Sequence, residues 1–310
     1  MRLLRPFGAR NDSEMRLLRP FGARNDSEMR LLRPFGARND SSCQLMNRIT
    51  QKFNQLRRQN KKALSCFITA GYPDLSTTGK IIRTLEDSGV DLIELGVPFS
   101  DPIADGPVIQ HSSAAALSGG VSLRKVLDLV KQVRVKTDIP IVIMSYLNPL
   151  YSYGLDRFFS DAAKSGVDGL IIPDIIMEES SGIKRLAGKN NVLLSYLVAP
   201  TTSEKRRRKI LKHTGGFVYA VSLTGVTGPR KNLTAGLREF LTKLRRETRK
   251  PVLLGFGISN RRQIRTIKKY VDGVIIGSAL IDIIRNSERP KLHGNIRNFL
   301  RGINEELKTK

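Results

Sequence analysis

A glutamate and two aspartates lie close together in the segment IELGVPFSDPIADGPVIQ, residues 93–110. Glu94 interrupts an apolar run that is typical of a strand buried on both faces, where an unpaired carboxylate is costly. Asp101 and Asp105 follow in a loop stiffened by prolines. Apolar surroundings raise the pKa of a carboxyl group, so that it can donate a proton near neutral pH, whereas a carboxylate in a wetter loop stays ionised. The segment therefore indicates that some function offsets the cost of burying Glu94.

Two glycine-containing turns late in the chain indicate a phosphate site. Gly255-Phe256-Gly257 follows one apolar run, and Gly277-Ser278 follows the next. Glycines let backbone N–H groups approach an anion closely, and barrels often bind phosphate with the loops after strands seven and eight. The simpler alternative is that these glycines only end their strands.

Eight apolar runs alternate with longer amphipathic segments from residue 63 onward. The expected strands are Leu64–Thr69, Leu92–Leu95, Ile141–Tyr146, Gly169–Pro173, Val192–Leu197, Phe217–Val221, Val252–Gly255 and Gly273–Ile276. Strand–helix alternation predicts parallel strands, and eight of them favour a single-domain α/β (β/α)8 TIM barrel over an open doubly wound sheet. A dinucleotide-binding sheet is disfavoured because no G-x-G-x-x-G follows the first strand.

The C-terminal ends of these strands are rich in polar residues, and this is the end of a barrel that carries the chemistry. The residues at or just after the strand ends include Thr69, Glu94, Tyr146, Asn148, Asp174, Ser222 and Thr227.

Residues 1–42 consist of a 14-residue unit, MRLLRPFGARNDSE, written three times with a final serine in the last copy. Each unit contains a proline and few apolar residues, so we expect the repetitive extension 1–45 to be disordered or not translated. Its acidic residues argue against an organelle transit peptide. Met46 would be a natural start, and the helical spacing of Ile49, Phe53 and Leu56 predicts an N-terminal leader helix before the barrel.

The chain is strongly basic, with 53 Lys and Arg against 28 Asp and Glu and a net charge of +25. Nucleic-acid binding is therefore a hypothesis, but no aromatic residues interleave with the basic clusters as stacking platforms would. We expect a solvated basic surface and no nucleic-acid partner.

The two cysteines form no metal-binding spacing and favour a reducing, cytoplasmic setting. No apolar run in the sequence is long enough for a membrane span.

Six segments occur in one order and together resemble the tryptophan synthase alpha chain family, from about Met46 to the C-terminus. They are FITAGYPD, ELGVPFSDPIADGPVIQ, MSYLNPL, SLTGVTG, GFGIS and IIGSA. The family cleaves indole-3-glycerol phosphate to indole and glyceraldehyde 3-phosphate by a retro-aldol reaction, so the resemblance implies a carbon–carbon lyase of tryptophan biosynthesis with its lyase domain at 46–310. It implies that Glu94 is the general acid/base that protonates the indole ring carbon bearing the side chain. Asp105 would lie at the indole N–H and stabilise the cationic ring.

The resemblance also assigns roles in substrate binding. An indole pocket would be formed by Phe67, Tyr146, Leu197, Tyr219 and Phe256. Phosphate would be held by Gly228, Gly257, Gly277 and Ser278. Thr227 would close its loop over the substrate and help to position Asp105. For Phe67 and Leu197 the alternative is ordinary barrel core.

The resemblance implies a partner, a tryptophan synthase beta chain that carries pyridoxal phosphate and consumes the indole in an α2β2 tetramer. This chain would need no cofactor or metal of its own. Pro98, Asp101 and Asn148 would face the partner. The sequence departs from the family at Asp174-Ile175-Ile176, where Asp-Leu-Pro is common, and the missing proline predicts a looser turn.

Three alternatives stay open. The chain could be a catalytically silent subunit that only activates its partner, although such a subunit need not keep Glu94, Asp105 and Thr227. It could be another phosphate-binding barrel, an isomerase or an aldolase, but no expected strand ends in the lysine that a Schiff-base aldolase needs. It could bind nucleic acid, which the charge alone suggests.

Overall fold

The computed structural model describes residues 46–222, 235–255 and 257–308. The repetitive extension 1–45 and the predicted site residues Thr227, Gly228 and Phe256 lie outside these ranges. None of the helices within the ranges is both long and apolar enough to span a membrane.

Strands and helices alternate along the described chain. The strands are β1 (Ala63–Thr69), β2 (Leu92–Gly96), β3 (Ile141–Met144), β4 (Gly169–Ile171), β5 (Leu193–Leu194), β6 (Leu197–Val198), β7 (Val218–Val221), β8 (Val252–Gly255) and β9 (Gly273–Ile276). The helices are α1 (Arg48–Arg58), α2 (Leu75–Asp87), α3 (Pro107–Ser118), α4 (Leu123–Arg134), α5 (Leu147–Tyr153), α6 (Leu155–Ser165), α7 (Ser181–Lys189), α8 (Glu204–His213), α9 (Ala235–Glu247), α10 (Arg261–Ile267), α11 (Ser278–Asn286) and α12 (Leu292–Lys308), with short 3-10 helices η1 (Met177–Glu179) and η2 (Lys268–Tyr270).

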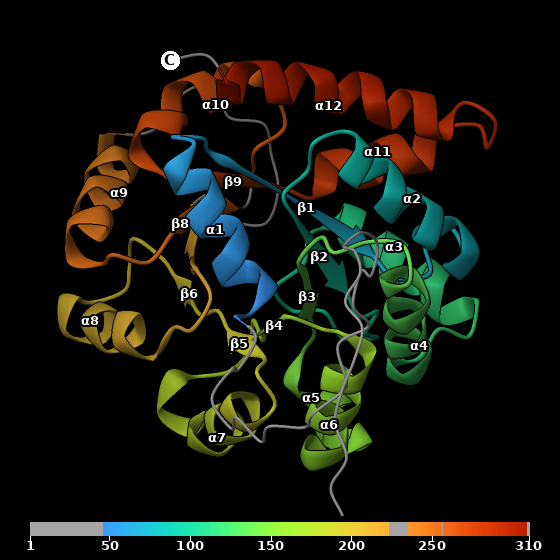
Figure 1. The fold of residues 1–310 in the computed structure, drawn as a ribbon, viewed down its shortest axis with the longest axis horizontal. Helices are drawn as coiled ribbons and strands as arrows, with labels where there is room; N and C mark the ends of the chain where they lie inside the picture. The colour runs from blue at the N-terminus through green and yellow to red at the C-terminus, as the bar shows by residue number, and fades with distance from the viewer. Residues whose placement is uncertain (1–45, 223–234, 256, 309–310) are drawn as a thin grey trace, which may run out of the picture. The chain divides into compact units, whose positions relative to one another are not determined.

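The described strands form one parallel sheet in the order β5-β4-β3-β2-β1-β9-β8-β7-β6. Its two ends, β5 and β6, are separated along the chain by only Ser195 and Tyr196, so the sheet returns to its starting point. Helices surround the strands in Figure 1. The predicted (β/α)8 TIM barrel is confirmed.

The sequence predicts a single fifth strand, Val192–Leu197, but the structure has two short strands there, β5 and β6. Its first half, β5, pairs with β4, and its second half, β6, pairs with β7. Between the two halves, the N–H of Ser195 donates to the carbonyl of Leu170, and the carbonyl of Tyr196 accepts from the N–H of Tyr219. The chain changes its hydrogen-bonding partner from β4 to β7 at this point, so the strand is interrupted. An apolar run in the sequence does not reveal such a change of partner.

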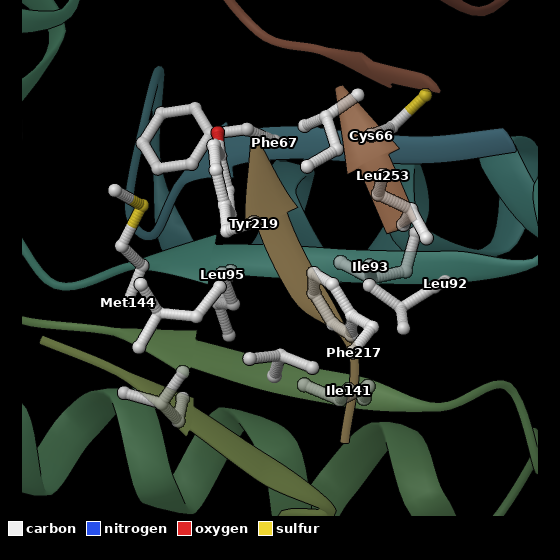
Figure 2. Packing of buried hydrophobic residues seen from close by; sticks show 14 of the residues in the cluster. Cys66, Phe67, Leu92, Ile93, Leu95, Ile141, Met144, Phe217, Tyr219 and Leu253 are labelled. Atoms are coloured by element: carbon white, nitrogen blue, oxygen red, sulfur yellow. The ribbon is translucent and has the colours of Figure 1, made fainter. Parts of the chain in front are cut away.

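The register of β1, β2 and β3 sets the positions of the site residues. Phe67 on β1 lies opposite Glu94 on β2, and Glu94 lies opposite Val142 on β3. Because side chains alternate across a strand, residues two apart share a face. Figure 2 shows buried side chains on both faces of these strands, since neighbours such as Cys66 and Phe67, or Leu92 and Ile93, point to opposite faces.

Helix α1 lies over the N-terminal ends of the strands (Figure 1). Ile49 is fully buried, and a Cβ placed on Gly169, at the start of β4, would lie 2.8 Å from its Cδ1. The rings of Phe53 and Phe217, which directly precedes β7, are 6.0 Å apart. The amide of Asn47 donates to the backbone carbonyl of Asp168 at 2.9 Å. The predicted leader helix is therefore confirmed, and it packs on the barrel.

Replacing Phe53 with alanine is expected to lower the free energy of unfolding by about 3 kcal/mol, because it leaves a cavity between α1 and Phe217. Chemical denaturation followed by circular dichroism measures this. Val135→Ala is the control, since Val135 is 82% exposed and its truncation should change the free energy by less than about 0.5 kcal/mol. Equal stability of the two variants would contradict the packing of α1 on the barrel.

Candidate active site

Glu94 occupies the middle of β2 and is fully buried. Its Oε1 accepts a hydrogen bond of 2.8 Å from the hydroxyl of Ser65, and its Oε2 has no hydrogen-bond partner among the residues that the structure describes. Burial raises the pKa of Glu94 to about 8, although the Ser65 bond opposes the shift. The carboxyl group is therefore protonated at neutral pH, as the apolar run around it predicts.

Asp105 lies in the loop between β2 and α3, directly before the N-cap residue of α3, Gly106. Its side chain is half-buried, and burial raises its pKa to about 6, while a hydrogen bond from the hydroxyl of Tyr146 opposes the shift. The same hydroxyl accepts the N–H of Ala104 at 2.8 Å. Tyr146 follows β3, so it fastens the Asp105 loop to the neighbouring strand end.

The strand ends of β1 to β4 enclose a small pocket of about 10 Å³, next to Asp105 and Tyr146. Its lining includes Phe67, Thr69, Gly96, Asp105, Met144 and Tyr146. The structure thus brings together three of the predicted site residues, Phe67, Asp105 and Tyr146. Glu94 is not part of this lining.

Tyr219 on β7 lies near both carboxyl groups. It is buried, and burial together with the charges of Glu94 and Asp105 raises the pKa of its hydroxyl well above the usual value. A Cβ placed on Gly255 would lie 2.4 Å from the Tyr219 hydroxyl, so the glycine leaves room for that group. Leu197 is half-buried and pairs with Tyr219 across β6 and β7, but it does not line the pocket beside Phe67.

The remaining predicted phosphate residues lie at neighbouring strand ends. Gly257 follows β8 with a φ of 80°, and Gly277 is the N-cap of α11, whose first residue is Ser278. Because β8 and β9 are paired, these two ends lie side by side, and the N-terminus of α11 offers unpaired N–H groups to an anion. A Cβ placed on Gly277 would lie 3.5 Å from the Cβ of Phe67, which connects this position to the pocket.

The residues predicted to face a partner differ in exposure. Asp101 and Asn148 are exposed after β2 and β3, whereas Pro98 is buried within this chain.

Asp174 has a role that the sequence did not reveal. Its two carboxylate oxygens accept the N–H of Leu147 at 3.0 and 3.2 Å, so Asp174 provides a hydrogen-bond acceptor for the first backbone N–H of α5. It does so although Ile176 stands two residues later, where the family commonly has proline.

Sequence reasoning missed one residue next to the chemistry, Ser65. A serine in an apolar strand, two residues before Phe67 and therefore on the same face, was the available signal. In the described part of the chain, no three His, Cys, Asp or Glu side chains gather as metal ligands.

Known proteins of one family resemble this chain over most of its length. The family model for the tryptophan synthase alpha chain matches residues 53–307. A tryptophan synthase alpha chain from Caldanaerobacter subterraneus is 44% identical over 263 residues, which are 84% of this chain and 100% of that protein. One from Geotalea daltonii is 45% identical over 258 residues, covering 83% of this chain and 98% of that protein. The crystal structure of tryptophan synthase subunit alpha from Legionella pneumophila has a TM-score of 0.79 at 35% identity, with 84% of this chain and 98% of that chain covered.

Proposed function

The chain belongs to the tryptophan synthase alpha chain family, and we propose that Glu94 and Asp105 carry out its reaction, the cleavage of indole-3-glycerol phosphate to indole and glyceraldehyde 3-phosphate. One observation supports this assignment above the others. The pKa of the buried Glu94 is raised to about 8 and that of Asp105 to about 6, so that at neutral pH a proton donor and an anion stand at one end of the barrel.

Glu94 supplies the proton that starts the reaction. Transfer of this proton to the indole ring carbon that bears the glycerol side chain converts the ring into a cation, with the charge centred on its nitrogen. The carboxylate of Asp105 accepts the N–H of that ring and stabilises the charge as it forms. At neutral pH Glu94 keeps its proton because burial raises its pKa to about 8, whereas Asp105 is ionised because its pKa, raised by burial to about 6, stays below neutral.

The bond between the ring carbon and the side chain then breaks. The side-chain carbon attached to the ring carries a hydroxyl group. As this hydroxyl loses its proton, a carbonyl forms on the side-chain carbon, and the electron pair of the broken bond returns to the cationic ring. Glu94, ionised by the first step, is the base that takes this proton, so the group returns to its starting state. The products are indole and glyceraldehyde 3-phosphate, and no electron is gained or lost.

The substrate would be held from both ends. We assign the indole to a wall formed by Phe67, Tyr146, Leu197, Tyr219 and Phe256, because the described members lie around the two carboxyl groups or on the paired strand β6. We assign the phosphate to Gly228, Gly257, Gly277 and Ser278, because Gly257 and the start of α11 lie at paired strand ends. Thr227 would close over the substrate.

Family membership also implies a beta-chain partner. We propose that this partner carries the pyridoxal phosphate, that the two chains form an α2β2 tetramer in the cytoplasm, and that this chain needs no cofactor of its own. Exposed Asp101 and Asn148 would face the partner, with Pro98 supporting the loop from beneath. We further propose that residues 46–310 form the lyase domain and that residues 1–45 take no part in catalysis.

The proposal is tested by measuring indole release from indole-3-glycerol phosphate as a function of pH, with and without a matching beta chain. The rate is expected to rise as the pH rises through about 6, because Asp105 must lose its proton, and to fall as the pH rises through about 8, because Glu94 must keep its proton.

A folded chain that binds its partner but releases no indole at any pH would show a silent activator instead. A rate that still increases above pH 8 would remove Glu94 as the acid.

A further inference from the structure

Two buried hydroxyl groups join the end of β1 to α3, the helix that follows Asp105. Thr69 is the last residue of β1, and Ser112 lies on α3. Both side chains are buried, and their hydroxyl oxygens are 2.6 Å apart. The hydroxyl of Ser112 also donates to the backbone carbonyl of Ile109, in the first turn of α3, at 2.8 Å.

The direction of these hydrogen bonds follows from the number of protons. A serine hydroxyl has one proton, and that of Ser112 goes to the carbonyl of Ile109, which can only accept. The proton between the two hydroxyl oxygens therefore belongs to Thr69. Thr69 donates to Ser112 and Ser112 donates to Ile109, so two hydrogen bonds in series fix the first turn of α3 to the end of β1.

The first turn of α3 determines where Asp105 lies. Asp105 directly precedes Gly106, the N-cap residue of this helix. The side-chain amide of Gln110, the residue after Ile109, donates to the backbone carbonyl of Asp105 at 2.8 Å. The carboxyl group of Asp105 accepts the hydroxyl of Tyr146, which follows β3. Asp105 is thus held from two sides, by the end of β3 and by a helix that is itself fastened to β1.

We propose that Thr69 and Ser112 are positioning residues that hold the start of α3 so that the Asp105 carboxylate stays in place for the reaction. This inference rests on the proposed role of Asp105 in stabilising the cationic ring. Neither hydroxyl has to touch the substrate, since both protons are used within the protein. Accurate placement matters because a displacement of about 1 Å can lower the rate of an enzyme by about 10²-fold.

Loss of the two hydrogen bonds should also change how Asp105 titrates. Burial raises its pKa to about 6, so a helix start that separates from β1 would admit water to the carboxyl group and lower this pKa toward the usual value of 3.8. Among the described residues, the titratable side chains that face Asp105 are Tyr146 and Tyr219. The pKa values of both are raised, so neither tyrosine loses its proton near pH 6. His111, on α3, packs its ring against that of Tyr72.

The test is the pH dependence of kcat/KM for the full chain with Thr69→Val, which keeps the shape of the side chain and removes its hydroxyl. We expect kcat/KM at pH 7 to fall by about tenfold, and the rise near pH 6 to move to lower pH. Ser112→Ala breaks the same chain of hydrogen bonds and should reproduce both changes. The double variant should lose no more than either single one, because the two substitutions remove one shared interaction. Thr69→Ser keeps the hydroxyl and should restore the original profile.

Thr84→Val is the matched control, because Thr84 is also buried and its hydroxyl bonds to Nδ1 of His293 at 2.8 Å, between α2 and α12. It should leave kcat/KM and its pH dependence unchanged. Circular dichroism shows whether each variant is folded, and Ser112→Ala, the smaller change, decides the question alone if Thr69→Val does not fold.

Unchanged kinetics in the folded variants would overturn the proposal. A lower rate whose rise stays near pH 6 would overturn it as well, because the hydroxyl groups would then act on a group other than Asp105. Failure of the proposed function would look different, since the unmodified chain would show no rise near pH 6 or Asp105→Asn would stay active.

Discussion

Replacing Glu94 with glutamine is expected to lower kcat for indole formation by about 10³-fold, within the range that loss of a general acid usually produces. Glutamine has nearly the same shape and can still accept from the Ser65 hydroxyl, so the change removes the transferable proton and little else. The measurement is the rate of indole release with substrate in excess, near pH 7. The residual activity should no longer fall as the pH rises through about 8.

Protein stability separates loss of chemistry from loss of fold in this variant. Because burial raises the pKa of Glu94 from 4.5 to about 8, the folded chain holds this proton more tightly than the unfolded chain, and folding becomes less favourable as the pH rises between these values. Glutamine does not ionise and avoids this loss. Glu94→Gln should therefore be as stable as the unmodified chain near pH 4.5 and more stable near pH 8.

Glu239→Gln serves as the control for this substitution, since Glu239 is exposed on α9 and the chemical change is the same. It should keep full activity. Full activity in Glu94→Gln as well would show that another group protonates the ring.

Replacing Asp105 with asparagine is expected to lower kcat by about 10²- to 10³-fold, comparable to the loss of one group that stabilises a developing charge. Asparagine can accept from the Tyr146 hydroxyl, as Asp105 does, but it carries no negative charge to set against the cationic ring. The pH profile identifies the cause. The rise in rate through about pH 6 should disappear, while the fall through about pH 8 remains.

Asp128 on the exposed face of α4 provides the comparison, and Asp128→Asn should behave like the unmodified chain. If Asp105→Asn kept the rise near pH 6, the group that titrates there would be a different one.

The sequence predicted the barrel because its signal is repeated. Each strand was visible as an apolar run, and each connecting helix as a segment with helical spacing, so an error in one element did not change the predicted fold. The break within the fifth strand was not predictable. It arises because the backbone changes its hydrogen-bonding partner between Ser195 and Tyr196, and the types of these two residues do not signal the change. Strand ends were also placed too late, since Tyr146 belongs to the start of α5 and not to β3.

The two carboxyl groups were predictable for a related reason. A glutamate within a buried strand is rare enough to be noticed, and an aspartate in a proline-rich loop after the same strand strengthens the signal for a functional site. Ser65 was not noticed because serine is common in every kind of segment, and its contact with Glu94 depends on the register of two strands. Asp174 was noticed, but its bond to the N–H of Leu147 arises from the packing of two loops.

The packing of α1 on the barrel has a consequence for the order of folding. The side chain of Asn47, at the start of this helix, donates to the carbonyl of Asn191, 144 residues further along the chain. Its neighbours Ile49 and Phe53 contact Gly169 and Phe217, which are similarly remote in sequence. Contacts that close such long loops form slowly and late. During synthesis on the ribosome α1 emerges before the barrel strands and is thus among the last of the described elements to complete its packing.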